Sequence, residues 1–359
     1  MIVEISKINI SMPMLKQITE IDEFKGSWNA GVVTRSEQFK QMKKVSTIES
    51  VGSSNRIEGN CLSNSEVETV LKNLGKQFFK NRDEEEVAGY AELLNTIYEN
   101  YSIIPFNENY VKQLHGILLN KVSKDVHHCG EYKKISNAVA AFDSDGHEIG
   151  IIFDTATPFD TPRMMKDLIE WTNEAFEECF FHPLIVIGVF IVHFLAIHPF
   201  QDGNGRLSRA LTTLLLLKAG YSYVPYSSLE SIIEASKSSY YLALRHTQKH
   251  IWDEQVDYEP WLSFFLMSLY KQKRHLENKV KLIEEYADLS NRALAVLKLF
   301  DDDEKLTSQE VVQKTGFNIE TVRKILQKLL GRGDIKKYGT TKTRSYQKNK
   351  NRNHERMPK

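Results

Sequence analysis

Residues 198–209 read HPFQDGNGRLSR and lie between two segments of strong helical character, 183–198 and about 205–219. The central residues DGNG (202–205) are poor helix formers, and between two helices they predict a tight turn. The backbone N–H groups of such a turn, together with the N-terminus of the following helix, form a site for anions. The stretch therefore predicts a helical fold in which one turn binds phosphate.

Charged side chains flank this turn. Arg206 and Arg209 are three positions apart at the start of the second helix, so both point towards the turn. Two arginines at a helix N-terminus oppose the helix dipole, and a polyphosphate would offset that cost better than a carboxylate. Asp202 is an acid among donors, as expected if it holds a divalent cation that bridges phosphate oxygens. His198 ends the preceding buried helix and is able to act as a base near neutral pH.

The same residues match the signature of the Fic family, His-Pro-Phe-x-Asp/Glu-Gly-Asn-Gly-Arg-x-x-Arg, at every specified position. The resemblance covers roughly residues 50–270. It implies a mainly helical (all-α) Fic fold. It also implies an enzyme that moves AMP from ATP to a Ser, Thr or Tyr hydroxyl of a target protein, or of the chain itself, and releases pyrophosphate.

The resemblance also implies a role for each residue of the motif. His198 would take the proton from the target hydroxyl as that oxygen attacks the α-phosphorus of ATP. Asp202 would bind Mg²⁺ across the α- and β-phosphates. Arg206 and Arg209 would take the β- and γ-phosphates. Three backbone amides would hold phosphate oxygens as charge builds on them, those of Gly203, Asn204 and Gly205.

A β-hairpin is predicted at residues 135–153, where the pattern is no longer helical. Two short strands, 137–142 and 147–153, flank an Asp-Ser-Asp-Gly turn. The resemblance identifies this hairpin with the Fic flap, which pairs with an extended segment of the target. It further implies nucleotide contacts from the flap and from a downstream helix, namely Val139, Ala140, Tyr240 and Tyr241.

A second motif precedes the core. Ser54, Glu58 and Gly59 fit the pattern Ser/Thr-x-x-x-Glu-Gly/Asn and resemble the inhibitory motif of one class of Fic proteins. The resemblance implies a docked helix that pairs Glu58 with Arg209 and displaces the γ-phosphate from its productive position. Because a buried ion pair is costly to break, we predict that the resting protein is largely inactive.

The C-terminal part has the pattern of a winged helix-turn-helix. A short capped helix, a turn at Gly316, a helix over 320–330 and a basic two-stranded wing at 335–346 follow one another. Residues 318–359 contain thirteen Lys or Arg and three acids, a net charge of +10 in a chain whose total is zero. DNA is the predicted partner; target recognition and homodimer formation are the alternatives. The predicted phosphate contacts are Arg323, Lys324, Lys328, Lys336, Lys337, Lys342 and Arg344.

At 359 residues the chain exceeds a typical single domain. We predict five segments: an N-terminal helical region with the inhibitory helix (1–105), the Fic catalytic core (106–272), a linker helix (273–290), the winged helix-turn-helix (291–346) and a disordered tail (347–359).

Composition and targeting signals indicate a cytoplasmic protein. Hydrophobic residues make up 41% and charged residues 26%, as in soluble globular chains. The three cysteines, at positions 61, 129 and 179, have neither metal-ligand nor redox spacing, which favours a reducing compartment. The N-terminus lacks signal-peptide features, and the longest apolar run, 183–197, is too short to span a bilayer.

Three other functions remain open. Family members of the Doc type transfer phosphate and carry Lys where this chain has Gly205, which favours adenylyl transfer here. Some members remove AMP, with the inhibitory glutamate activating water, a role open to Glu58. The third alternative is a DNA-binding regulator that only senses nucleotide, which the intact His198 argues against.

Overall fold

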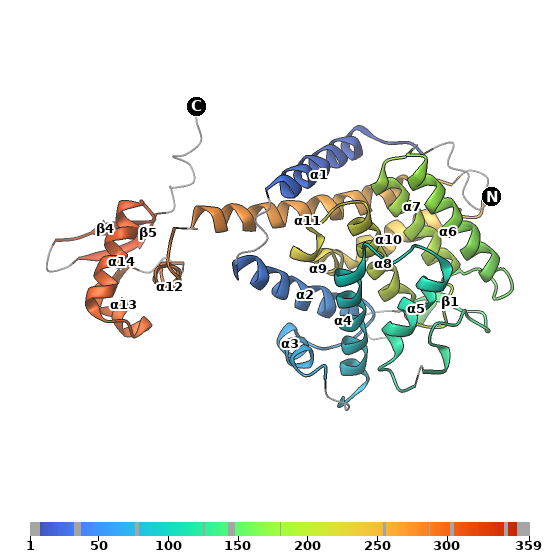
Figure 1. The fold of residues 1–359 in the computed structure, drawn as a ribbon, viewed down its shortest axis with the longest axis horizontal. Helices are drawn as coiled ribbons and strands as arrows, with labels where there is room; N and C mark the ends of the chain where they lie inside the picture. The colour runs from blue at the N-terminus through green and yellow to red at the C-terminus, as the bar shows by residue number, and fades with distance from the viewer. Residues whose placement is uncertain are drawn as a thin grey trace. The chain divides into compact units, whose positions relative to one another are not determined.

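The structure, a computed structural model, describes residues 8–31, 37–75, 79–124, 126–142, 148–179, 181–253, 256–286, 288–301, 305–340 and 344–349. The chain divides into two compact units, unit 1 (Met1–Glu277) and unit 2 (Asn278–Lys359), shown in Figure 1. Within the described stretches no helix is both long and apolar enough to cross a membrane.

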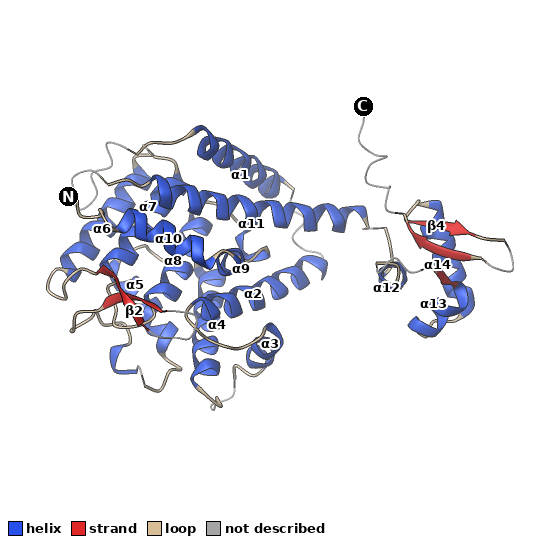
Figure 2. Ribbon diagram, turned by 180° about the vertical axis from the view of Figure 1, so that it is seen from behind, coloured by secondary structure: helices blue, strands red, loops and turns tan. Residues whose placement is uncertain are grey.

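Unit 1 is mainly helical, as predicted, with one β-hairpin (Figure 2). Its α-helices are α1 (Met12–Ala30), α2 (Glu37–Ile57), α3 (Asn64–Lys72), α4 (Arg82–Asn100), α5 (Glu108–Leu119), α6 (Thr161–Glu177), α7 (Pro183–Ile197), α8 (Asn204–Lys218), α9 (Leu229–Ala235), α10 (Lys237–Gln248) and most of α11 (Glu259–Glu285), which continues past Glu277. Two short 3₁₀ turns, Val126–His128 and Val224–Tyr226, complete it. The predicted linker helix corresponds to the C-terminal part of α11.

The central element of unit 1 is α7. Its residues are apolar on every side, and all of Leu184–Ile197 are buried. The helices α6, α8 and α10 pack against it (Figure 1). Gly188 permits the close approach of α11: a Cβ there would lie 2.6 Å from Leu262, and the Gly188 carbonyl accepts a 2.7 Å hydrogen bond from the Trp261 indole. This packing fixes the C-terminal end of α7, where the motif begins.

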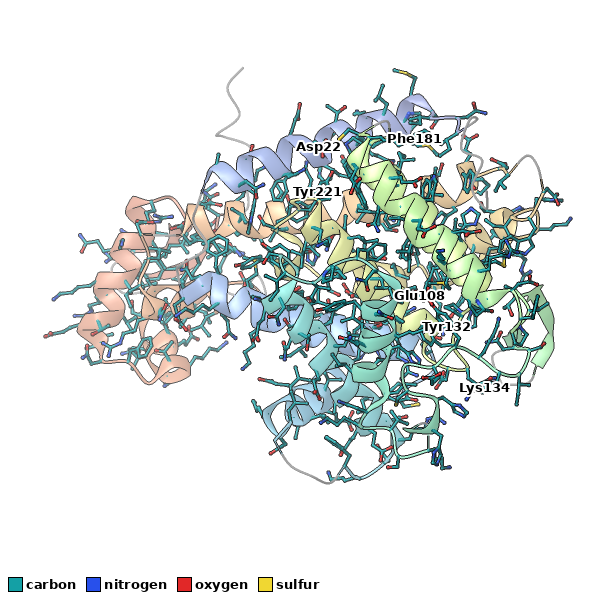
Figure 3. The ribbon with its side chains drawn as sticks, turned by 45° about the vertical axis from the view of Figure 1, so that its right-hand side comes forward. Asp22, Glu108, Tyr132, Lys134, Phe181 and Tyr221 are labelled. Atoms are coloured by element: carbon teal, nitrogen blue, oxygen red, sulfur yellow. The ribbon has the colours of Figure 1, made fainter. Side chains whose placement is uncertain are left out.

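One carboxylate of the N-terminal helix α1, that of Asp22, bonds two residues of the core. The Tyr221 hydroxyl donates to Asp22 Oδ1 over 2.7 Å, and His182 Nε2 lies 2.8 Å from Asp22 Oδ2. Figure 3 shows Asp22 and Tyr221 together between α1 and the core. Because His182 Nδ1 accepts from the Leu184 amide, its Nε2 carries a proton and donates to Asp22.

The predicted hairpin is confirmed. Strands β1 (Ala138–Phe142) and β2 (Glu148–Asp154) pair antiparallel, from Ala138 opposite Asp154 to Phe142 opposite Glu148. The predicted turn at 143–146 and the side chains of both strands, including Val139 and Ala140, lie outside the described part of the structure.

After the end of α11, the described residues of unit 2 form three helices and a three-stranded sheet: α12 (Asn291–Lys298), β3 (Leu306–Thr307), α13 (Ser308–Thr315), α14 (Ile319–Gly331), β4 (Ile335–Tyr338) and β5 (Ser345–Lys348). The sheet is antiparallel in the order β3-β5-β4. Its core contains Val296, Phe300, Val311, Val322 and Leu329.

Two details of unit 2 differ from the sequence prediction. We predicted two strands, and a short third strand, β3, pairs with β5. We also placed residues 347–359 in a disordered tail, but β5 continues to Lys348 because its register pairs Lys348 with Ile335. Residues 350–359 lie outside the described part of the chain.

Candidate active site

Two left-handed residues shape the turn between α7 and α8. His198 ends α7 at φ 52° and ψ 60°, and Gly203 precedes α8 at φ 78°. The left-handed conformation suits Gly203 but costs a residue with a side chain roughly 1–2 kcal/mol. His198 is therefore held in a strained backbone conformation at the C-terminal end of α7, and contacts with the surrounding chain are needed to stabilise it.

The turn itself is closed by Asn204. Its side-chain oxygen Oδ1 accepts a hydrogen bond from the Phe200 N–H (2.9 Å). Its side-chain nitrogen Nδ2 donates a hydrogen bond to the Phe200 carbonyl (2.7 Å). The side chain is buried, so this residue does more than contribute the backbone amide that the sequence prediction assigned to it. The Asn204 side chain fixes the spacing between Phe200 and the start of α8.

Sequence analysis missed His115 of α5. Its Nδ1 accepts from the Gly130 amide over 3.0 Å, so its Nε2 carries the proton and donates to the Asp202 carbonyl, also over 3.0 Å. The ring stacks on Phe200 with centroids 3.8 Å apart. Burial lowers the pKa of His115 to about 4, so the ring stays neutral near pH 7. His115 thus stabilises the turn through a hydrogen bond and a ring stack, and it adds no charge there.

The His198 imidazole has the protonation state that a general base requires. Its Nδ1 lies 3.2 Å from the Leu195 carbonyl, an acceptor, so Nδ1 carries the proton and the lone pair is on Nε2. Burial lowers the pKa of His198 to about 4, opposed in part by the Leu195 carbonyl. The ring is therefore neutral at physiological pH and able to accept a proton at Nε2.

The residues of the inhibitory motif come together at Arg209. Glu58 Oε1 lies 2.8 Å from Arg209 Nη2, and Arg209 also donates to the Ser54 hydroxyl (2.9 Å) and carbonyl (2.8 Å). Burial lowers the pKa of Arg209, but the surrounding groups, with the Glu58 carboxylate the largest among them, together raise the pKa of the guanidinium above its ordinary value. Gly59 (φ 99°) follows α2 and reverses the chain after Glu58. The pairing predicted between Glu58 and Arg209 is present.

Gly205 lies in close contact with the Glu58 carboxylate. A Cβ built on Gly205 would lie 2.1 Å from Glu58 Oε1, which is far inside van der Waals contact. The absence of a side chain at this position of the first turn of α8 thus leaves room for the Glu58 carboxylate. A lysine here, as in the Doc pattern, would exclude Glu58 from its present place.

Asp202 belongs to a closed ring of four charges. Its Oδ2 lies 3.1 Å from Arg82 Nη2 and 3.4 Å from Arg206 Nη2. Both arginines also contact Glu86, at 2.9 Å from Arg82 and 3.4 Å from Arg206. The sequence prediction placed Asp202 and Arg206 here but missed Arg82 and Glu86, both on α4.

The donor set fits a magnesium-bound polyphosphate. Asp202 supplies a carboxylate beside the turn, and Mg²⁺ commonly combines one or two carboxylates with substrate phosphates. Arg206 and Arg209 are 3% and 4% exposed, yet Arg206 Nε and Arg209 Nη1 have no hydrogen-bond partner among the described residues. Buried unpaired donors of this kind are uncommon, and phosphate oxygens would satisfy them.

The two tyrosines of α10 differ from each other. Tyr240 is buried, with its ring centroid 5.9 Å from that of Trp261, and burial raises the pKa of its hydroxyl. Tyr241 is half-buried, with its ring centroid 5.1 Å from that of Tyr240. Tyr240 thus packs within the core of aromatic rings, and an adenine contact of either tyrosine stays a prediction.

The family model described as Fic/DOC family matches residues 105–216, which include α5, the hairpin, α7 and the motif turn. Residues 105–216 form a Fic/DOC family domain. Relatives of this Fic domain include the protein adenylyltransferase Fic of Aedes aegypti, 27% identical over 188 residues, 51% of this chain and 34% of that protein. That of Drosophila grimshawi is 26% identical over 234 residues, 64% of this chain and 44% of that protein. The chain thus spans between a third and a half of the length of these curated relatives.

Solved structures show the same fold. A Fic family protein from Desulfovibrio desulfuricans G20 superposes with a TM-score of 0.59 at 22% identity, covering 95% of this chain and 97% of that one. A Fic domain containing signaling protein from Bacteroides thetaiotaomicron gives a TM-score of 0.57 at 22% identity, covering 72% and 94%. The match to the first of these extends beyond the Fic domain to nearly the whole chain.

Proposed function

We propose that unit 1 is a protein adenylyltransferase that moves AMP from ATP to a Ser, Thr or Tyr hydroxyl of a target protein or of the chain itself. The observation that carries the proposal is the convergence on one turn of a neutral imidazole with a free Nε2 and two buried arginines with unpaired N–H groups. The Fic domain and its relatives named protein adenylyltransferase support the same reaction.

The residues would act as follows. The hydroxyl oxygen of the target forms a bond to the α-phosphorus, the bond from that phosphorus to the bridging oxygen of the β-phosphate breaks, and pyrophosphate leaves. The hydroxyl proton passes to Nε2 of His198. Mg²⁺ at Asp202 would supply positive charge beside the phosphates. The amides at the start of α8 and the two arginines would stabilise the charge that moves to pyrophosphate.

In the resting chain Glu58 would compete for the same arginine. Arg209 cannot donate Nη2 fully to a γ-phosphate while that atom bonds the Glu58 carboxylate at 2.8 Å. Removing the carboxylate from this buried arginine without a replacement anion leaves a charge unpaired, so the pair persists until ATP or a regulator replaces it. The proposed enzyme is therefore autoinhibited.

The experiment that tests this function compares two labelled forms of ATP. The Glu58→Gly chain is incubated with Mg²⁺ and ATP labelled in either the α- or the γ-phosphate, and the product is weighed by intact mass spectrometry. Adenylyl transfer retains the α-label, loses the γ-label and adds the mass of AMP. Retention of the γ-label alone would instead identify phosphoryl transfer. Loss of AMP from a pre-modified protein with the wild-type chain, but not with the Glu58→Gly chain, would identify AMP removal.

A second function, DNA binding, is supported by the surface of unit 2. The element order of unit 2 is that of a winged helix-turn-helix, in which α14 would enter the major groove. Exposed basic side chains lie on α14 and β4, namely Arg323, Lys324, Lys328, Lys336 and Lys337. Lys328 is partly neutralised by Asp288, at 3.7 Å. Of the remaining predicted contacts, Arg344 is half-buried and Lys342 lies outside the described residues.

Removing two of these charges should weaken DNA binding in a salt-dependent way. We expect the full chain with Arg323→Ala and Lys324→Ala to bind double-stranded DNA more weakly, and the slope of log K against log salt to fall by about 2, because each lost phosphate contact removes about 0.9. Fluorescence anisotropy over a salt series measures both. The control is Lys298→Ala, an exposed lysine on α12. Equal loss in the control, or unchanged affinity in the double variant, would contradict the proposal.

A further inference from the structure

Four consecutive carbonyl oxygens around the general base, those of residues 197–200, accept hydrogen bonds from two residues that precede the hairpin. The contacts are Lys133 Nζ to Ile197 O (2.9 Å), Asn137 Nδ2 to His198 O (3.4 Å), Lys133 N to Pro199 O (2.8 Å) and Asn137 Nδ2 to Phe200 O (2.9 Å). The strained segment that holds the imidazole is thus bonded along its length by Lys133 and Asn137.

The same two residues bond the ends of the hairpin. Asn137 directly precedes β1, and Thr155 directly follows β2. Lys133 Nζ donates to Asn137 Oδ1 (2.8 Å) and to the Thr155 hydroxyl (2.9 Å), while that hydroxyl lies 2.7 Å from the Asn137 carbonyl. Lys133, Asn137 and Thr155 form what we call the hairpin-end cluster. It connects both ends of the hairpin to the segment that carries His198.

The chemistry of this cluster is unusual for a purely structural contact. Lys133 is only 3% exposed, and all three of its Nζ bonds go to uncharged oxygens. Burial lowers the pKa of Lys133 to about 8. A buried ammonium without a carboxylate is costly, and an apolar residue of similar size would fill the space at less cost. What an apolar residue cannot supply is three directed donors at one point.

We propose that Lys133 and Asn137 are positioning residues for His198. They hold the backbone of residues 197–200 at a fixed place relative to the hairpin. A target segment that pairs with the hairpin would then present its hydroxyl at a defined distance from Nε2 of His198. The inference rests on the proposed adenylyl transfer. It adds that the hairpin-end cluster sets the position of His198 relative to the target segment that pairs with the hairpin.

The test compares Lys133→Met and Asn137→Asp with Lys134→Met in the Glu58→Gly chain. Lys134 is the adjacent lysine and is exposed; it lies with Tyr132 on the segment before the hairpin in Figure 3. We expect kcat to fall about 100-fold in the first two variants, as for a displacement of about 1 Å between reacting groups, with KM for ATP nearly unchanged. Lys133→Arg, which keeps the donors, should recover most of the rate.

An activity-independent measurement separates this inference from the proposed function. Hydrogen exchange of the amides in residues 198–203 should accelerate about tenfold in Lys133→Met and Asn137→Asp, as expected for the loss of one or two hydrogen bonds, and stay unchanged in Lys134→Met. If the parent chain transfers no AMP but exchange changes in this local way, adenylyl transfer fails and the positioning role stands. Equal kcat in all variants, or a joint loss of kcat, ATP affinity and thermal stability, would overturn the positioning role.

Discussion

The Glu58→Gly chain is expected to transfer AMP about 10- to 100-fold faster than the wild type. In the resting protein the buried Arg209 donates to Glu58 over 2.8 Å, and a hydrogen bond between charged groups contributes about 1.5–3 kcal/mol. Without the carboxylate, the Nη2 hydrogen that bonds Glu58 would become available to a phosphate, as the unpaired Nη1 already is. Incorporation of α-labelled ATP, with the affinity for ATP followed by calorimetry, measures the effect.

Two control variants make this result specific. Glu37→Gly removes an exposed glutamate at the other end of α2 and should leave transfer unchanged. Glu58→Gln keeps the shape of the side chain but loses its charge, so its rate should lie between those of the wild type and Glu58→Gly. A Glu58→Gly chain no faster than the wild type, with equal ATP affinity, would show that the observed ion pair does not limit transfer.

The local parts of the site were predictable from the sequence because each depends on neighbours in the chain. The break between two helices at residues 202–205 follows from poor helix formers, and the structure places Gly203 in the left-handed conformation expected of such a break. The burial of α7 follows from an apolar run without a polar face. The inhibitory pair was predictable only through the resemblance, since nothing local brings Glu58 to Arg209 across 151 positions.

The supporting residues were not predictable because they depend on tertiary contacts. Lys133 and Lys134 are identical in type and adjacent in sequence, yet one is 3% exposed and the other lies at the surface. Arg82 contacts Asp202, which is 120 positions away in the sequence. Its neighbours at the start of α4 are charged, as is common at the solvent-exposed end of a helix, so the sequence does not single out Arg82. His115 is a histidine on the amphipathic helix α5, and nothing in the sequence shows that its partner is the carbonyl of Asp202 at the motif turn.

Replacing His198 with alanine is expected to reduce AMP transfer by about a hundred- to ten-thousand-fold in the Glu58→Gly chain, the usual contribution of a general base. ATP binding should persist, because Arg206, Arg209 and the amides of the turn remain. The matched control is His246→Ala, an exposed histidine on α10. If His198→Ala kept its rate, proton removal by the imidazole would be wrong even though the chain transferred AMP.

The pH dependence gives a second, independent check on His198. Because burial lowers the pKa of His198 to about 4, the imidazole is already neutral well below the ordinary value of about 6.5, and the base form is lost only as the pH falls through 4. Removing Glu58, whose carboxylate raises the pKa of His198, extends that range further. We expect kcat/KM, which reports the free enzyme, to be nearly equal at pH 7.5 and pH 5.5. A histidine with an ordinary pKa would instead lose about tenfold over this interval, and that loss, matched by an NMR titration of the His198 ring, would contradict the buried neutral base.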